Sequence, residues 1–323
     1  MHLNSKIYVA GHLGLVGSAI MRQLRIKGYK NIVTRTRAQL DLTNQKSVAD
    51  FFALEKPEYL FLAAAKVGGI YANNTYPAEF IFSNLAIQTN IIHQSYLSGV
   101  KRLLFLGSSC IYPRDCLQPI KEEFFLTGAL EPTNQPYAVA KIAGIEMCWS
   151  YNRQYNTKYL AVMPTNLFGI GDNYDLETSH VIPALIRKFH EAKKNNHEIV
   201  TVWGTGKPKR EFLYSDDMAE ACIFILNLQD HVFNSLLTSS EIKRLPPLVN
   251  LGSSFELTID ELANLIKKVV GFKGKVIFDS SKPDGIMRKL IDSDRLNQLG
   301  WNAKTKLLDG LEITYQNFKT TRS

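Results

Sequence analysis

The chain opens with a short strand pattern that runs directly into a glycine-rich turn. Residues 6–10 are mostly β-branched, aromatic or small, as in a buried strand. Gly11, Gly14 and Gly17 follow in the spacing G-x-x-G-x-x-G, and residues 18–24 repeat apolar side chains at helical spacing. Glycines permit a tight turn and let backbone N–H groups approach a pyrophosphate, and the helix N-terminus adds partial positive charge. Strand, turn and helix in this order predict a dinucleotide site; the alternative is a tight turn without a ligand.

Strand and helix patterns alternate through the first half of the chain. Strands are expected at residues 32–34, 59–64, 102–107 and 159–164, and helices at 45–54, 77–98 and 136–155. This alternation predicts an α/β fold with a Rossmann-like, doubly wound parallel sheet. Ligands of such a sheet lie at the carboxyl ends of its strands.

The pattern changes after Gly169. A helix is expected at 181–194, strands at 200–203 and 248–251, and an amphipathic helix at 257–270. The strand at 248–251 is expected to return to the main sheet. We therefore predict a cofactor-binding domain over residues 1–175, rejoined by about 215–256, and a smaller C-terminal α/β substrate lobe built from 176–214 and 257–323.

Composition points to an ordinary globular protein of the cytoplasm. The 323 residues are 45% hydrophobic and 21% charged. No apolar stretch is long enough to span a bilayer, and the N-terminus lacks the apolar segment of a signal peptide. The four cysteines show neither metal-ligand spacing nor a secreted disulfide framework. We therefore expect a cytoplasmic protein without a bound metal or a membrane partner.

The net charge of +8 indicates an anionic partner. No block rich in lysine or arginine stands out, so nucleic acid is not the expected ligand. A phosphorylated small molecule accounts for the excess charge equally well, and scattered solvated lysines account for most of it.

A second pattern carries chemistry. Tyr137 and Lys141 lie four residues apart in a predicted helix, so they share one face. A nearby ammonium is expected to lower the pKa of the tyrosine, so that the phenol exchanges a proton near neutral pH. Ser108 and Ser109 follow a predicted strand, where a hydroxyl can bond the same substrate oxygen. By itself the Tyr–Lys spacing is equally typical of an exposed helix pair.

Ser, Tyr and Lys behind a glycine fingerprint resemble the triad of the short-chain dehydrogenase/reductase superfamily. The resemblance covers the whole chain and is best to the extended branch, which acts on nucleotide sugars. Longer motifs narrow it, at residues 63–70, 72–75, 106–113, 131–134, 163–167, 179–184 and 281–285. Together, over residues 6–318, they resemble the GDP-L-fucose synthase family, bifunctional GDP-4-keto-6-deoxy-D-mannose 3,5-epimerase/4-reductases.

The second strand is followed by basic residues where NAD enzymes carry a carboxylate. Arg35 and Arg37 suit a 2′-phosphate, so NADP(H) is the expected cofactor; the alternative is a solvated basic turn. Asp41 and Leu42 resemble the superfamily's adenine-side contact. Leu13 stands where the family's glycine turn usually carries a basic residue, so Arg37 is expected to contribute more to phosphate binding.

The resemblance also implies further contacts with the cofactor. They extend from the glycine turn to strand ends and include Leu15, Val16, Leu106, Ser109, Lys141, Pro164, Asn166, Leu167 and His180.

Two acid/base residues for epimerisation are implied as well. A C4 ketone acidifies the hydrogens on C3 and C5, and epimerisation needs one group to remove a proton and another to return one. The resemblance assigns this work to Cys110 and His180. Taken alone, Cys110 reads equally well as a buried strand-end residue, and His180 as the cap of a turn.

For the substrate's nucleotide diphosphate, the resemblance implies Lys188, Trp203, Arg210 and Asp284. The ordinary alternatives are a solvated helix lysine, a packed tryptophan and a surface ion pair. The family's habit also implies a homodimer, formed through the helices at 77–98 and 136–155.

Two other functions share part of this sequence pattern. A nucleotide-sugar 4,6-dehydratase or 4-epimerase would share the fold, but dehydratases place an acidic pair after the strand-end hydroxyl, and residues 109–111 contain no acid. A non-catalytic NADP-binding module would not need the intact Ser108, Tyr137 and Lys141.

Overall fold

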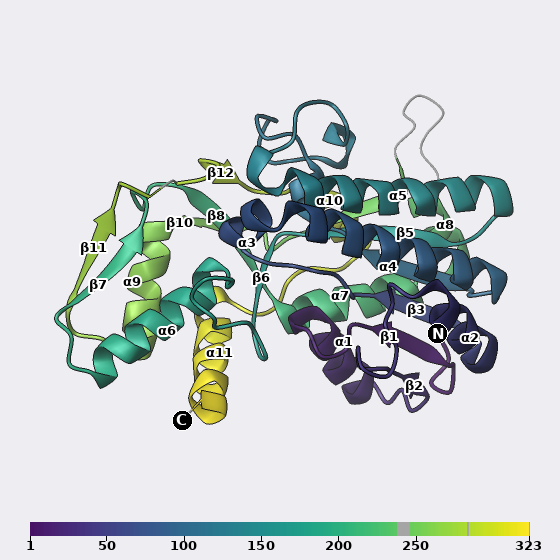
Figure 1. The fold of residues 1–323 in the computed structure, drawn as a ribbon, viewed down its shortest axis with the longest axis horizontal. Coiled ribbons are helices and arrows are strands. Elements are labelled where there is room, and N and C mark those ends of the chain that lie inside the picture. Colours follow the sequence, from purple (N-terminus) through teal and green to yellow (C-terminus); the bar gives the residue numbers. More distant parts are fainter. Residues whose placement is uncertain (238–245, 283, 323) are drawn as a thin grey trace.

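Six parallel strands form the central sheet of the protein, in the order β2-β1-β3-β4-β5-β9 (Figure 1). The structure is a computed structural model and describes residues 1–237, 246–282 and 284–322. The strands are β1 (Ile7–Ala10), β2 (Ile32–Val33), β3 (Tyr59–Leu62), β4 (Arg102–Leu106), β5 (Tyr159–Pro164) and β9 (Leu248–Leu251). The predicted doubly wound parallel sheet is confirmed, and so is the return of residues 248–251 to it.

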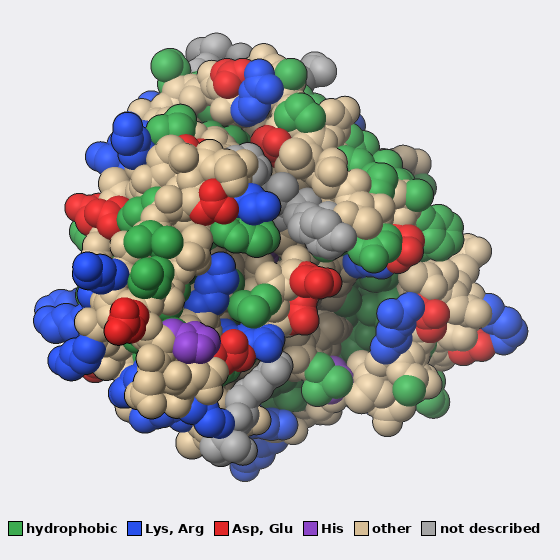
Figure 2. Space-filling model, turned by 60° about the vertical axis from the view of Figure 1, so that its left-hand side comes forward, with side chains coloured by type: hydrophobic (Ala, Val, Ile, Leu, Met, Phe, Trp, Pro, Cys, Tyr) green, Lys and Arg blue, Asp and Glu red, His purple; other side chains and the backbone are tan. Residues whose placement is uncertain are grey.

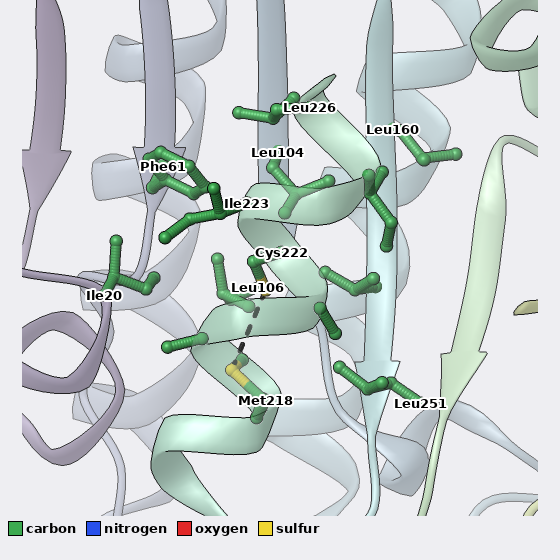
Figure 3. Packing of buried hydrophobic residues seen from close by; sticks show 14 of the residues in the cluster. Ile20, Phe61, Leu104, Leu106, Leu160, Met218, Cys222, Ile223, Leu226 and Leu251 are labelled. Carbon is green, nitrogen blue, oxygen red and sulfur yellow. Dashed lines mark hydrogen bonds between the residues drawn. The ribbon is translucent and has the colours of Figure 1, made fainter. Parts of the chain in front are cut away.

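Helices cover both faces of this sheet. One face carries α1 (Leu15–Ile26), α7 (Ser215–Asn227), α8 (Asp230–Leu237) and α10 (Asp294–Asn297), and the other carries α2 (Gln45–Glu55), α4 (Pro77–Leu97) and α5 (Gln135–Tyr155). Neighbouring side chains of β4 alternate between the two cores: Leu104 points to the α7 side and Phe105 to the α5 side. Figure 3 shows Cys222 and Ile223 of α7 packed over Phe61 and Leu104. Each such fully buried Leu, Ile or Phe stabilises the fold by roughly 1.5–3 kcal/mol.

A smaller lobe lies beyond the carboxyl ends of the strands (Figure 1). Strand β8 (Lys209–Tyr214) pairs with β10 (Glu256–Thr258), β12 (Arg288–Lys289) and β6 (Asn166–Phe168), and β7 (Ile199–Trp203) pairs with β11 (Lys275–Asp279). Its helices α6 (Val181–Lys194), α9 (Ile259–Val270) and α11 (Leu307–Arg322) share a third apolar core. The helix predicted at 181–194 is observed with those bounds. Short helices lie in the connections that follow β3 and β4: α3 (Ile70–Thr75), η1 (Ser109–Ile111), η2 (Glu122–Phe124) and η3 (Pro132–Asn134).

The prediction of a helix over residues 257–270 was wrong at its start. Residues 256–258 form β10, and α9 begins at Ile259. The physical reason is a capping box: the Thr258 side chain accepts from the Glu261 backbone N–H, and the Glu261 carboxylate accepts from the Thr258 N–H. The division into domains stays a prediction; residues 238–245, within its returning segment, lie outside the described part of the chain.

A buried carboxylate joins the lobe to the central sheet. Glu211 of β8 is fully buried, and its carboxylate accepts from the backbone N–H groups of Ser253 (2.7 Å), Ser254 (2.8 Å) and Ile291 (3.2 Å). Its carbonyl oxygen accepts from the Asn166 side chain at 2.8 Å. These bonds fix β8 against the segments that follow β5, β9 and β12.

Candidate active site

The glycine turn lies where the strand order reverses. Strand β1 lies between β2 and β3, so its carboxyl end is a topological switch point, where ligands of open α/β sheets bind. Gly11 has φ +83°, and a Cβ there would lie 2.6 Å from the Ala64 nitrogen. A Cβ on Gly17 would collide with the Gly11 carbonyl. Both glycines are therefore required by the packing of the turn itself.

Gly14 differs from these two glycines. A Cβ there would meet only the Gly11 carbonyl oxygen, at an ordinary 3.6 Å. The protein thus leaves open space above Gly14, directly before α1, whose first turn contains no acidic residue. Open space beside a helix N-terminus free of carboxylates fits a phosphate group.

The structure distinguishes the two arginines after β2. The Arg35 guanidinium donates to the Glu55 carboxylate at 2.5 Å and lies 5.4 Å from the centroid of the Phe51 ring. Arg37 is exposed, and no hydrogen bond or ion pair to a described residue holds its side chain. Arg37 is therefore the arginine free to meet an anion.

The predicted adenine-side segment is fixed by local bonds. The Asp41 carboxylate accepts from the Thr43 backbone (2.9 Å) and hydroxyl (2.8 Å), and these bonds lower the pKa of Asp41. The Leu42 carbonyl accepts from Asn90 of α4 at 2.9 Å. Both residues keep a defined position on the rim of the sheet.

Ser108 and Cys110 follow the carboxyl end of β4. Ser108 is the N-cap residue of η1, and its hydroxyl oxygen accepts from the Cys110 backbone N–H at 3.3 Å. Cys110 is buried, and burial raises the pKa of its thiol. The charges of Lys289 and Lys141 oppose this rise by favouring the thiolate.

Lys141 is held beneath Tyr137. Its Nζ donates to the Leu106 carbonyl at 2.7 Å and lies 5.7 Å from the centroid of the Tyr137 ring. Burial lowers the pKa of Lys141 to about 8. The expected lowering of the Tyr137 pKa was wrong: burial raises that pKa, and the nearby Cys110 adds to the rise. Tyr137 therefore keeps its proton at neutral pH.

His180 lies immediately before α6. It occupies the N-cap position, but its side chain makes no capping hydrogen bond. Although the side chain reaches solvent, the surrounding protein atoms desolvate it enough to lower its pKa, and the charge of Lys289 acts in the same direction. A neutral imidazole can accept a proton at pH 7.

Sequence reasoning missed Lys289. It lies on β12 in register with Arg210 of β8, and its charge acts on both Cys110 and His180. Desolvation lowers the pKa of Lys289. No spacing pattern in the sequence marks this lysine, because only the pairing of β12 with β8 brings it to the site.

The residues predicted to bind the nucleotide diphosphate gather on the smaller lobe. Trp203 is 59% exposed at the end of β7, with the Nζ atoms of Lys188 and Lys282 at 5.2 and 5.6 Å from its ring centroid. Asp284 accepts from the backbone and hydroxyl of Thr205 (2.7 and 2.8 Å). Lys282 was not predicted as a contact, and Pro283, within the motif at 281–285, lies outside the described part of the chain.

Arg210 completes this group. Desolvation lowers its pKa, whereas the Asp284 carboxylate raises it. Figure 2 shows a hollow on this side of the molecule, bordered by basic and acidic side chains. An arginine that is partly withdrawn from water and lies near a carboxylate suits a diphosphate.

Other predicted cofactor contacts lie at strand ends. Ser109 and Pro164 are buried, Leu106 supplies the carbonyl that holds Lys141, and Leu167 packs on the apolar core. The Asn166 amide donates to Glu211, so this side chain serves the junction between the lobes. Leu15 and Val16 form the first turn of α1, behind the glycine turn.

Comparison with known proteins agrees with the fold. The sequence model of the NAD dependent epimerase/dehydratase family matches residues 7–235. The chain belongs to this family.

Three relatives show how far the likeness extends. GDP-L-fucose synthase 1 of Arabidopsis thaliana is 56% identical over 97% of this chain and 92% of its own length. GDP-L-fucose synthase of Escherichia coli is 53% identical over 97% of this chain and 96% of its own. A solved GDP-mannoheptose C4 reductase from Campylobacter jejuni with NADP bound has a TM-score of 0.88 and 40% identity, covering 99% of both chains.

Substitution of single glycines should separate folding from cofactor binding. We expect Gly11→Ala to lower the free energy of unfolding by at least about 1–2 kcal/mol, because alanine is strained at positive φ. Gly14→Ala should change stability by less than about 1 kcal/mol. Its methyl group occupies the open space above the turn, so the Kd for NADPH should rise roughly tenfold, equivalent to about 1.4 kcal/mol.

Urea denaturation and NADPH fluorescence titration measure these two effects. Unchanged NADPH affinity in a folded Gly14→Ala protein would contradict the placement of the phosphates above this turn.

Proposed function

We propose that the protein converts GDP-4-keto-6-deoxy-D-mannose to GDP-L-fucose. The reaction epimerises C3 and C5 and then reduces the C4 ketone with NADPH. The observation that carries this proposal is the convergence of two proton-transfer residues, Cys110 and His180, on one lysine charge beside Tyr137 and Lys141. The two GDP-L-fucose synthases, which match almost the whole chain, support it.

Epimerisation needs a base, an acid and a stabilised enolate. Cys110 and His180 divide the first two roles: one removes the proton from C3 or C5, and the other returns a proton to the opposite face. Lys289 favours the Cys110 thiolate and the neutral His180 imidazole, so its charge sets both groups for proton transfer. The hydroxyls of Ser108 and Tyr137 bind the C4 oxygen and stabilise the negative charge that develops there.

Reduction uses the same hydroxyl groups. NADPH, when bound, supplies the hydride that C4 receives. Tyr137 donates its proton to the C4 oxygen, which suits a phenol whose raised pKa keeps it protonated. Lys141 stabilises the resulting phenolate, and its bond to the Leu106 carbonyl fixes the ammonium beneath the ring. The glycine turn and Arg37 hold the phosphates of the cofactor.

The competing functions have less support. A dehydratase would need an acid after the strand-end hydroxyl, and that place is occupied by Cys110 within η1. A non-catalytic NADP-binding module would not need a buried lysine beneath Tyr137. The nucleotide-sugar chemistry therefore fits the residues best.

We infer a homodimer formed through α4 and α5. These helices pack side by side, and they leave large apolar side chains in solvent, among them Phe82 and Leu97, 68% and 60% exposed. We also propose a cytoplasmic location, which suits a catalytic thiol, since all four cysteines are free. No helix in the described ranges has the length and apolar character needed to cross a membrane.

The cofactor preference should depend on Arg37. We expect the wild type to favour NADPH over NADH, and Arg37→Ala to remove a charge-assisted contact of about 1.5–3 kcal/mol. The ratio of kcat/KM with NADPH to kcat/KM with NADH should then fall roughly ten- to a hundredfold. Arg35→Ala is the matched control and should keep the preference, because its side chain is already engaged by Glu55. Steady-state kinetics with both cofactors give the ratio, and equal efficiency of the wild type with NADH contradicts the proposal.

Epimerisation and reduction should separate in single variants. In heavy water with substrate and NADPH, the wild type should form GDP-L-fucose that carries deuterium at C3 and C5, identified by NMR and mass spectrometry. Cys110→Ala should abolish or sharply reduce deuterium uptake, and His180→Ala should show a related defect. Tyr137→Phe should lose most NADPH oxidation but keep some exchange, because Ser108 still polarises C4. Wild-type exchange in Cys110→Ala would make that cysteine a packing residue.

The activity should fall at alkaline pH as Lys141 loses its proton. Its pKa of about 8 means that the ammonium is present below this pH and lost above it. We therefore expect kcat/KM for NADPH to decline above about pH 8. Lys141→Arg keeps its charge at all accessible pH values, so this decline should disappear, whatever the residual rate. An identical pH profile in Lys141→Arg would assign the decline to another group.

A further inference from the structure

Asn73 of α3 has a buried hydrogen-bond acceptor that no described residue pairs with. The residue is 6% exposed, and its Nδ2 donates to the Gly68 and Gly69 carbonyls at 2.8 and 3.0 Å. Its Oδ1 is buried and accepts no bond from any described residue. Turning the amide over would place this oxygen against two carbonyl oxygens, so the acceptor's position is fixed. Native structures rarely leave such a group unpaired, which points to a donor supplied by a ligand.

The position of Asn73 places this acceptor beside the reacting groups. The Gly69 N–H donates to the Thr178 carbonyl at 3.0 Å, two residues before His180. Gly68 lies against the Phe80 ring, whose edge meets the Tyr137 ring with 6.4 Å between centroids. Both carbonyls that hold the Asn73 amide thus belong to a segment that lies between Tyr137 and His180.

The neighbouring helix supports the same placement. Helix α3 packs against η3, which leads into α5 and Tyr137. Asn134, the last residue of η3, also has a buried side-chain oxygen for which the described part of the chain offers no donor. Two unpaired acceptors on adjoining elements beside the reacting residues indicate a ligand that brings hydroxyl donors.

The chemistry of the substrate limits which donors are available. In a GDP-4-keto-6-deoxyhexose, C1 carries the diphosphate, C4 is a ketone, C5 bears the ring oxygen and C6 is a methyl group. Only C2 and C3 carry hydroxyls. Resting on the function proposed above, we propose that Asn73 Oδ1 accepts a hydrogen bond from one of these two hydroxyls and so selects the sugar.

Substrate analogues test this contact without relying on stability. We compare kcat/KM for GDP-4-keto-6-deoxy-D-mannose with that for its 2-deoxy and 3-deoxy analogues. The wild type should favour the complete sugar at least tenfold over one analogue, since a site built for a hydroxyl rejects its absence. In Asn73→Ala and Asn73→Ser this preference should fall by roughly tenfold, because the acceptor is gone. The ratio is independent of the fraction of folded enzyme.

Asn84→Ala is the matched control. Asn84 is also a buried asparagine close by, but its amide is fully paired with Lys66 and Phe80 backbone groups. The preference of the Asn84→Ala variant for the complete sugar should equal that of the wild type. The assignment would be overturned if the wild type used both analogues as efficiently as the complete sugar. It would also be overturned if the preference for the complete sugar were unchanged in both Asn73 variants. Failure of the wild type to form GDP-L-fucose would instead contradict the proposed function.

Discussion

The site depends on one constraint, the parallel arrangement of the central sheet. Parallel strands must be joined by crossovers, so all six strands end at the same edge. Gly11 follows β1, Ser108 and Cys110 follow β4, and Asn166 follows β5. Residues far apart in the sequence are therefore brought to the same end of the sheet, and the side chains of each strand, which alternate between the two apolar cores, fix the sheet between its helices.

Burial of cations tunes the chemistry at this edge. Lys141 and Lys289 are both desolvated, which lowers their pKa values. Each lies near a group that transfers a proton in the proposed reaction. Lys141 lies beneath Tyr137, and Lys289 acts on Cys110 and His180. Desolvation raises the pKa of Tyr137, so the phenol is suited to give a proton rather than to remove one.

The smaller lobe brings the second half of the site to the first. Glu211 bonds to backbone groups that follow β9 and β12, and its carbonyl is held by Asn166 beyond β5. The neighbouring Arg210 therefore has a defined place relative to the central sheet. A buried carboxylate with three N–H donors is costly to disrupt, so this junction holds in place the paired strands in which Lys289 is in register with Arg210.

The alternation of strands and helices, the glycine turn and the shared face of Tyr137 and Lys141 could all be predicted from the amino-acid sequence, because they depend on spacing over a few residues. It also placed α6 correctly, since apolar periodicity and the residues at both ends agree. It misjudged the start of α9, where a strand and a capping box compete with apolar periodicity. Three other features became visible only in the folded chain: Glu55 engages Arg35, Lys289 acts on Cys110 and His180, and no described residue pairs with the Asn73 oxygen. These facts arise from strand pairing and burial between distant segments, which local sequence patterns do not encode.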